Sequence, residues 1–375
     1  ELHLERLNKT KYKSNLKVLL LNLFVTYSVS SKMYLSVPRG AGDYSASRYN
    51  SNNIGYKVFI KIFDVLTKLK YIEYHSGHYD SFTATGNRSR IRANTKLIKC
   101  FKSYSISTAM ITNDKEEETI IRKKSKDESI NPNRKDLVDY IDNPTTNKMR
   151  SNLEEINALL DRTWIDIEIS DKEHTKLNKA LDKKPDKNPI DFTRRKLRRI
   201  FNNSSFEHGG RFYHGWWQEI PSAYRKYITI SGKLTEEEDF SGIHIRMLYA
   251  LEDIEIGSED TYLIEGFGRK YRDQVKVALN TIINAKTKKE AIYSINSELT
   301  LPKNKSAQDL FNQLELKHPK IAKYFATGIG IELQYKDSII AEKVILRLAR
   351  DNIVALPVHD SFIVRMSHIN DLKKE

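Results

Sequence analysis

Two aspartates stand where neighbouring strands could hold a metal ion between them. Asp239 closes the acidic run 236–239 at the end of an expected strand, and an apolar stretch follows it. Residues 354–364 (VALPVHDSFIV) are typical of a β-hairpin with Asp360 at its tip. Mg²⁺ prefers carboxylate oxygens, so two such tips brought together would make a two-carboxylate metal site. Only folding can pair them, because positions 239 and 360 are 121 residues apart.

A second pair of residues could bind phosphate. Arg272 and Lys276 lie four positions apart on an expected helix, so their side chains point the same way. Two cations on one face can hold a triphosphate, the lysine as a point charge and the arginine as a fork. Cations placed there would stabilise the negative charge that grows on a leaving phosphate. A solvated basic face, with Arg269 and Lys270 as its neighbours, is the alternative.

Blocks of this region resemble family A nucleic-acid polymerases, the group of bacterial DNA polymerase I, to which single-subunit phage and mitochondrial RNA polymerases are related. In chain order they are Gly210-Arg211 with QEIP at 218–221, DFSGIHIR at 239–246, YRDQVK at 271–276, Gln334, and VHDS at 358–361. The last block is closer to the HDS of the RNA polymerases than to the HDE of the DNA polymerases. The resemblance covers roughly residues 206–366.

The resemblance implies an α+β fold of the right-hand polymerase type. We expect residues 206–375 to form a palm, an antiparallel sheet with helices, and residues 261–330 to be a short helical fingers insertion. Residues 111–205 would be a connector and a reduced helical thumb, with a capped helix starting at Ser151 and a linker at 183–189. The basic segment 194–199 lies where the thumb would grip a duplex, although a solvated face is the alternative.

The resemblance also implies roles for single residues. Two Mg²⁺ ions, or Mn²⁺ in their place, would be held by Asp239, Asp360 and the backbone carbonyl of Phe240, and Lys276 would join the two aspartates in catalysis. The expected nucleotide contacts are Arg272, Lys276, His244 and Phe240. The expected contacts to a DNA primer–template are Arg211, Gln218, Gln334 and His359. Trp216 and Trp217 could stack on bases, but packing against the palm is the favoured role.

This chain departs from the family pattern at three positions. His244 stands where the DNA polymerases place a glutamate beside the ribose 2′-position, so the choice of sugar stays open. Asn280 and Asn284 stand where they carry an aromatic residue and a tyrosine. Because that aromatic residue stacks on the incoming base, template dependence stays open too.

Residues 1–110 have the pattern of a nucleic-acid-binding module. Two helices are expected, at 16–29 and 56–69, followed by strands at 71–74 and 89–92 around a polar tip. Helices followed by a basic hairpin suggest a winged helix, with Arg88, Arg90 and Arg92 on phosphates and the preceding helix in a groove. An ordinary helical module with a solvated hairpin is the alternative.

The amino-acid composition restricts the classes of protein to which the chain could belong. The chain has 375 residues and 63 Lys and Arg against 49 Asp and Glu, a net charge of +14 that favours a polyanionic partner. A single cysteine excludes an internal disulfide framework and a Cys-rich zinc site. The apolar run 16–30 is too short to span a bilayer, so we expect a buried helix rather than a signal peptide, and no membrane partner. Because residue 1 is Glu, the natural N-terminus is expected upstream.

The combined expectation is a cytoplasmic, nucleoid-associated DNA polymerase that extends a 3′-hydroxyl with nucleoside triphosphates. An RNA polymerase or primase of the same palm type is the enzymatic alternative. A DNA-binding replication or mobile-element protein with a vestigial palm is the alternative from another class.

Overall fold

The computed structural model describes residues 9–80, 85–111, 118–123, 136–182, 190–240, 242–257 and 259–375. Within them the chain is a mixed α+β structure, as expected, and its strand pairs are antiparallel except for β6 with β8. Short 3₁₀ helices connect the larger elements: η1 Ala41–Tyr44, η2 Thr108–Met110, η3 Trp216–Glu219, η4 Arg269–Tyr271, η5 Ala322–Tyr324 and η6 Met366–His368. None of the described helices is long and apolar enough to cross a membrane.

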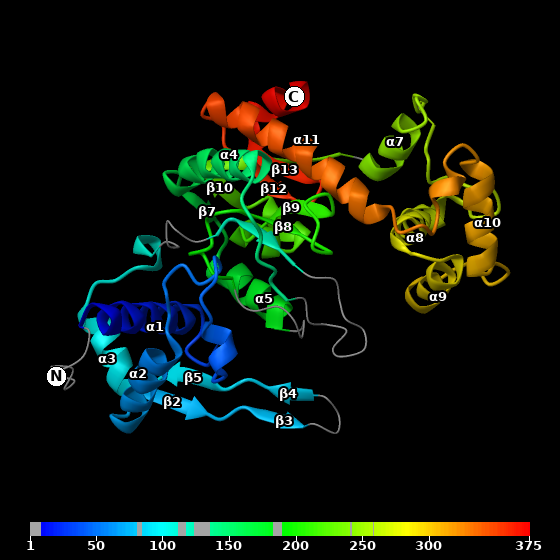
Figure 1. Cartoon of the computed structure of the whole chain (residues 1–375). Helices are drawn as coiled ribbons and strands as arrows, with labels where there is room; N and C mark the ends of the chain where they lie inside the picture. The colour runs from blue at the N-terminus through cyan, green and yellow to red at the C-terminus, as the bar shows by residue number, and fades with distance from the viewer. Residues whose placement is uncertain are drawn as a thin grey trace.

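A five-stranded antiparallel sheet lies at the centre of the C-terminal part (Figure 1). In spatial order its strands are β12 (Leu356–Val358), β13 (Ser361–Arg365), β11 (Lys233–Asp239), β10 (Ile228–Ile230) and β7 (Ile165–Ile167). The expected strand that ends at Asp239 and the expected hairpin around Asp360 are therefore both confirmed, and they are neighbours in one sheet.

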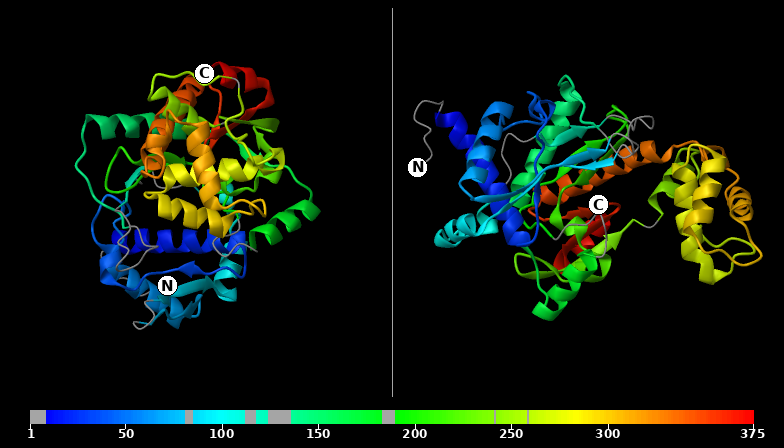
Figure 2. Two further views of the ribbon diagram at one scale, coloured as in Figure 1. Left: turned by 90° about the vertical axis from the view of Figure 1, so that its right-hand side faces the viewer. Right: turned by 90° about the horizontal axis from the view of Figure 1, so that it is seen from below.

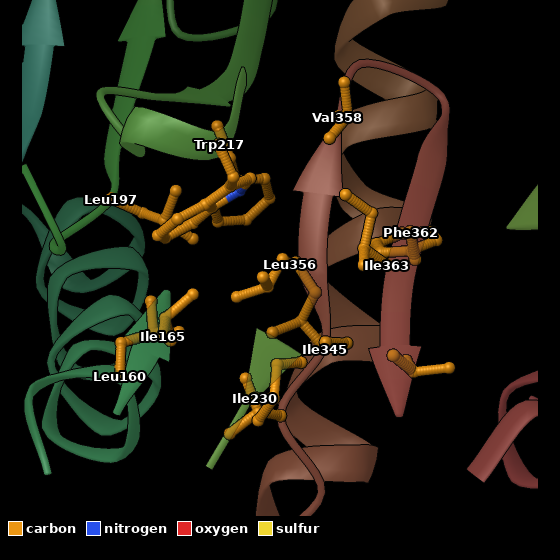
Figure 3. Packing of buried hydrophobic residues seen from close by; sticks show 14 of the residues in the cluster. Leu160, Ile165, Leu197, Trp217, Ile230, Ile345, Leu356, Val358, Phe362 and Ile363 are labelled. Atoms are coloured by element: carbon orange, nitrogen blue, oxygen red, sulfur yellow. The ribbon is translucent and has the colours of Figure 1, made fainter. Parts of the chain in front are cut away.

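Two long helices and the sheet enclose one apolar core. The helices are α4 (Pro144–Asp161) and α11 (Gly330–Arg350), which contact each other. Figure 3 shows Leu160, Ile345 and Leu356 facing this core together with Trp217. All three residues of β12 and residues 361–364 of β13 are buried, so the protein covers both faces of this hairpin. This packing fixes the position of the strand ends at which the two aspartates lie.

A second sheet lies beside the first and contains β6 (Ile120–Arg122), β8 (Arg198–Phe201) and β9 (Gly209–Tyr213). Strand β9 packs along α11. Trp216 and Trp217, which follow β9, are almost completely buried, so packing is their role in this fold. The remaining helices of this part are α5 (Asp171–Asp182), α6 (Ser222–Arg225) and α12 (Ile369–Lys374).

A helical group projects from one end of α11, apart from the two sheets (Figures 1 and 2). Its helices are α7 (Ile243–Ala250), α8 (Arg272–Asn284), α9 (Lys288–Glu298) and α10 (Ala307–Lys317). The group has its own core, built around Leu248, Leu279, Ile282 and Phe311. The residues expected as a short helical insertion, 261–330, supply α8, α9 and α10.

The N-terminal part is a third body with its own core. It contains α1 (Lys9–Val29), β1 (Leu35–Ser36), α2 (Tyr56–Lys68), β2 (Ile72–His75), β3 (His78–Asp80), β4 (Thr85–Asn87), β5 (Arg90–Ala93) and α3 (Thr95–Ser103). The helices α1 and α2 and the strands β2 and β5 lie close to the expected ranges. The strand order is β1-β5-β2, and the β3–β4 hairpin extends from these strands. Leu19 and Leu23 of α1 are buried in the core of this part, which confirms the expected buried helix.

The segment 111–205 differs from the expected connector with a thumb. Helix α4 begins at Pro144 rather than at Ser151, because the Asn143 side chain accepts from the Thr146 N–H and proline suits the first helical position. Strand β7 joins the central sheet and β8 joins the second one, so these pieces are part of the sheets themselves. The proposed linker 183–189 lies outside the described residues.

The basic segment 194–199 is neither a helix nor a solvated face throughout. Its last two residues belong to β8, and Arg199 is completely buried. Arg194 pairs with Glu219 at 2.8 Å, and Arg195 donates to the carbonyls of Ala109 and Ile111 at 3.2 Å. These contacts hold the polypeptide together, because each of the three guanidinium groups already has a protein partner.

Candidate active site

The two aspartates are adjacent in the fold. In the β11–β13 ladder Asp239 lies opposite Ser361, the residue that follows Asp360. The Phe240 N–H donates to the Asp360 carbonyl at 3.1 Å, which fixes the hairpin tip against the end of β11. Two carboxylates 121 positions apart are thus brought together by one pair of neighbouring strands. Ser241, the third residue of the DFSG block, lies outside the described residues.

The hairpin tip has a constrained backbone. His359 has a φ of +58°, which residues other than glycine adopt only uncommonly. Ser361 holds the start of β13, because its hydroxyl donates to Glu237 at 2.5 Å. Glu237 in turn accepts from Arg225 at 2.6 Å. Left-handed backbone at such a tip is the kind of strain that the surrounding packing must maintain, and it is concentrated at functional sites.

The electrostatics of this corner favour a cation. Burial raises the pKa of the Asp239 carboxyl, and the negative charge of Asp360 raises it further, with smaller contributions from Glu237 and Glu238. Lys276 acts in the opposite direction. Carboxylates that repel each other across a short gap are stabilised by a divalent cation between them.

A cavity of about 360 Å³ opens at the hairpin tip, and Asp360 but not Asp239 is among the residues that line it. Its walls come from the sheet, from α7 and α8, and from the start of α11. Eight of the residues expected to act here or to mark a departure from the family line it: Arg211, His244, Lys276, Asn280, Asn284, Gln334, His359 and Asp360. The expectations from separate sequence blocks therefore meet in one place. A volume of this size accommodates a small ligand.

The two expected phosphate-binding cations differ in their surroundings. Lys276 faces the cavity and, within the described residues, forms no ion pair, so it is available for an anion. Arg272 instead donates to Asp260 at 2.6 Å, and its guanidinium lies 5.2 Å from the ring centre of Tyr262. An incoming phosphate would have to compete with Asp260 for this arginine.

Arg211 and His244 are joined through a residue that the sequence did not single out. Asp337 of α11 is buried and accepts two hydrogen bonds from the Arg211 guanidinium. The His244 Nε2 lies 2.9 Å from the Asp337 Oδ2. The same Nε2 lies 3.2 Å from an Arg211 guanidinium nitrogen, so one ring nitrogen of His244 faces both the carboxylate and the cation. Asp337 thus orients both cavity residues.

Gly210 is needed for the turn that presents Arg211. Its φ is +78°, and a Cβ at this position would lie 2.6 Å from the Phe201 ring and 3.0 Å from the Ser338 hydroxyl. A side chain would therefore push β9 away from α11. Gly210 thus allows β9 to lie close to α11, and the next residue, Arg211, is thereby held at the cavity.

Gln218 is not presented to the cavity. Its amide nitrogen donates to the carbonyls of Phe212 at 2.9 Å and Pro357 at 3.0 Å, and its oxygen accepts from Gly215. Trp217 also donates to Pro357. The QEIP block therefore anchors β12, the strand that leads into the His359–Asp360 tip. The sequence predicts that Gln218 touches a duplex, but in the structure both polar atoms of its side chain are hydrogen-bonded to backbone groups.

The three wing arginines lie in the N-terminal part, outside the cavity lining. Arg92 pairs with Glu73, and its guanidinium lies 4.7 Å from the ring centre of Tyr34. Arg90 also lies over Tyr34, at 5.6 Å, and Arg88 is 3.9 Å from Asp43. Part of the positive charge expected on the wing is thus compensated within the protein.

Two further residues belong to the site although the sequence reading missed them. Tyr262 lines the cavity, and its hydroxyl lies 3.0 Å from the position of a Cβ on Gly242. Asp337 lies one helical turn after Gln334 on α11, a spacing that places both on nearly the same side of the helix. That spacing is the signal that could have found Asp337, whereas nothing local marks Tyr262.

Comparisons of this chain with protein-family models, with curated proteins and with solved structures gave no match. The likeness to family A polymerases therefore rests on the sequence blocks alone.

Divalent cations should stabilise the protein through the two aspartates. The folded chain holds a proton on Asp239 at a higher pH than the unfolded chain does, so stability falls as pH rises through that window. Above it the ionised pair repels, and a bound cation would offset the repulsion. At a hundredfold excess over Kd, Mg²⁺ or Mn²⁺ should raise Tm by about 5 °C at pH 7.5.

Thermal melts with and without metal between pH 4 and pH 8 would test this. The metal-dependent shift should shrink towards acid pH and vanish in Asp239→Asn, whose metal-free Tm at pH 7.5 should exceed that of the wild type. Glu238→Gln, which changes the neighbouring charge paired with Lys373, should retain the shift. An equal shift in Asp239→Asn would show that the metal binds elsewhere.

Proposed function

We propose that this protein is a metal-dependent nucleotidyltransferase of the family A polymerase type, which extends a 3′-hydroxyl with nucleoside triphosphates. One observation carries the proposal: Asp239 and Asp360, far apart in sequence, lie at neighbouring ends of the paired strands β11 and β13, next to a cavity lined by Asp360 and Lys276. The central sheet would then be the palm, and the helices α8 to α10 the fingers. DNA primer–template is the proposed partner.

The donor set fits Mg²⁺. Two carboxylates, with the backbone carbonyl of Phe240 close by, leave coordination positions for water and for phosphate oxygens, as Mg²⁺ requires. Within the described residues no group of three or more His, Cys, Asp or Glu could hold a metal ion, so the proposed protein ligands are these two carboxylates and the carbonyl. When bound, two such ions would stabilise the attacking and leaving oxygens of phosphoryl transfer.

The residues around the aspartates have distinct proposed roles. Lys276 binds the phosphates and neutralises charge on the leaving pyrophosphate. Arg272 joins it after exchanging Asp260 for a phosphate oxygen. The Asp337-bound His244 meets the sugar, and Arg211, held by the same carboxylate, keeps that histidine in place.

Primer extension tests the proposal. A labelled DNA primer–template is incubated with Mg²⁺ or Mn²⁺ and with dNTPs or NTPs offered separately, beside a primer without template. Growth that stops when the primer ends in a dideoxynucleotide would support transfer to a 3′-hydroxyl. Preference for NTPs would favour RNA synthesis, the second candidate, to which HDS at 359–361 and His244 point. No extension under any condition would refute nucleotidyl transfer by this site.

Lys276→Ala should lower kcat/KM for the nucleotide by about 10²-fold, because it removes the cation nearest the transferring phosphates. Arg272→Ala should have a smaller effect, because its charge is already shared with Asp260. Single-nucleotide incorporation kinetics would measure both. Lys270→Ala provides a control of equal charge on the preceding 3₁₀ helix, and its kcat/KM should match the wild type. Equal losses in Lys276→Ala and Lys270→Ala would contradict a specific phosphate contact.

A further inference from the structure

The positive charge of the chain is concentrated in its N-terminal part. Residues 1–111 contain 18 Lys and Arg against 6 Asp and Glu, a net charge of +12 out of the +14 of the whole chain. The remaining 264 residues, which include the candidate active site, are nearly neutral overall. A polyanion binding by electrostatics would therefore be drawn to the N-terminal part rather than to the sheets or to the α7–α10 group.

Within this part, α2 presents a lysine face to solvent. Phe59, Ile62, Phe63 and Leu66 form the buried side of the helix. On the opposite side Lys57, Lys61, Asp64 and Lys68 recur at intervals of three or four residues and are exposed. A shallow groove runs along this lysine face, and Tyr56, Ile60 and Val65 complete its lining.

The three lysines of this face are not compensated by the protein. Within the described residues none of Lys57, Lys61 and Lys68 has a carboxylate partner. The single acid among them, Asp64, is paired with Arg39 at 3.4 Å. Arg39 is held in place in turn, because its guanidinium lies 4.8 Å from the ring centre of Phe63. By contrast, the nearby wing arginine Arg92 already has an acidic partner.

The dimensions of the lysine face fit one kind of polyanion. Eleven residues separate Lys57 from Lys68, a length of about 16 Å along the helix axis. The major groove of B-form DNA is about 12 Å wide and admits an α-helix, whereas the major groove of A-form RNA is too deep and narrow. The β3–β4 hairpin extends from the sheet beside α2 and would lie along the backbone flanking such a groove (Figure 1).

We infer that α2 binds the major groove of double-stranded DNA, with Lys57, Lys61 and Lys68 contacting phosphates. This surface lies outside the candidate active site and does not depend on the proposed catalysis. The main phosphate contacts are then made by the lysines of α2 rather than by the wing arginines, because Arg92 already donates hydrogen bonds to Glu73.

The experiment uses the full-length chain and a covalently closed DNA duplex, a dumbbell without a 3′-end, so that binding as a primer is not possible. Fluorescence anisotropy gives Kd at several salt concentrations. The triple variant Lys57→Ala/Lys61→Ala/Lys68→Ala should bind at least tenfold more weakly. Its plot of log K against log salt should be shallower by about 2–3, because each phosphate contact contributes about 0.9 to the slope.

The matched control is Lys96→Ala/Lys99→Ala/Lys102→Ala, which removes the same charge from exposed positions of α3 in the same part of the chain. It should retain the wild-type slope. Circular dichroism melts of both triple variants would establish that each is folded. If both triple variants weakened DNA binding equally, only the net charge would matter. If duplex RNA or single strands bound as tightly as the dumbbell, binding in the major groove of DNA would be excluded. Either result overturns the inference.

An inactive palm would leave the prediction intact. Asp239→Asn should bind the dumbbell like the wild type, whether or not the protein extends primers. Conversely, a protein that extends primers but shows no dependence on the α2 lysines would refute this inference and leave the proposed function standing.

Discussion

Asp239→Asn and Asp360→Asn should each reduce primer extension by about 10³-fold. Each substitution removes one of the two carboxylates proposed to hold the catalytic metal ions. The transition state would then lose electrostatic stabilisation of several kcal/mol, and each 1.36 kcal/mol corresponds to a tenfold change in rate. Because asparagine has nearly the same shape, the sheet should be preserved. Single-turnover extension measured beside DNA affinity would separate loss of chemistry from loss of binding.

Glu238→Gln is the matched control for these variants. Glu238 adjoins Asp239 on β11 but pairs with Lys373 at 3.3 Å. Its extension rate should stay within about twofold of the wild type. If Asp239→Asn and Asp360→Asn extended primers as fast as Glu238→Gln, the two-carboxylate site would have to be abandoned, even if the protein proved to be a polymerase.

The largest effect on stability is expected from Arg199→Met. Arg199 is completely buried, pairs with Glu342 at 3.0 Å, and donates to the Gly210 carbonyl at 2.8 Å and to the Ser338 hydroxyl at 2.9 Å. Burial lowers the pKa of its guanidinium, but arginine remains charged at neutral pH, so the variant leaves Glu342 as a buried charge without its cation. The expected loss is about 3–5 kcal/mol.

Urea denaturation followed by tryptophan fluorescence is a suitable measurement, because Trp216 and Trp217 are buried in the adjoining core. The double variant Arg199→Met/Glu342→Leu should recover much of the loss, because removing both partners avoids an isolated charge. If the single and double variants were equally unstable, the ion pair would not be the cause and packing of the arginine stem would be.

The Arg199 pair also links stability to the candidate site. Gly210, whose carbonyl it holds, precedes Arg211, and Ser338 follows Asp337, the residue that orients Arg211 and His244. Displacing β9 relative to α11 would therefore move the cavity wall. Arg199→Met should accordingly lose affinity for nucleotide at temperatures where it is still folded, although it touches no ligand.

Much of the site could be predicted from local sequence. An acidic run closing a strand, a hairpin with an acidic tip, and cations four residues apart on a helix are short-range patterns with the periods of strand and helix. The structure bears out those elements for Asp239, Asp360, Arg272 and Lys276. Their chemistry remains a prediction.

Other features could not be read from local patterns, because they depend on partners distant in sequence. The basic segment 194–199 was expected to grip a duplex, but Glu342, 143 positions away, pairs with its Arg199. Gln218 was expected to reach a duplex, but the carbonyl of Pro357, 139 positions away, takes its amide. In both cases the sequence allowed more than one role for the residue, and contacts that form only in the folded chain decided between them.

The sequence by itself determined the residue types available for chemistry, the helices and strands that carry them, and the excess of positive charge in residues 1–111. Tertiary structure decided which of those charges are available. It buried Arg199 against Glu342, engaged Arg92 with Glu73 and Arg272 with Asp260, and left Lys276 and the lysines of α2 without acidic partners among the described residues. The physical reason is that the strength of a charge depends on its partner and its exposure to water, and both are set by packing between segments distant in sequence.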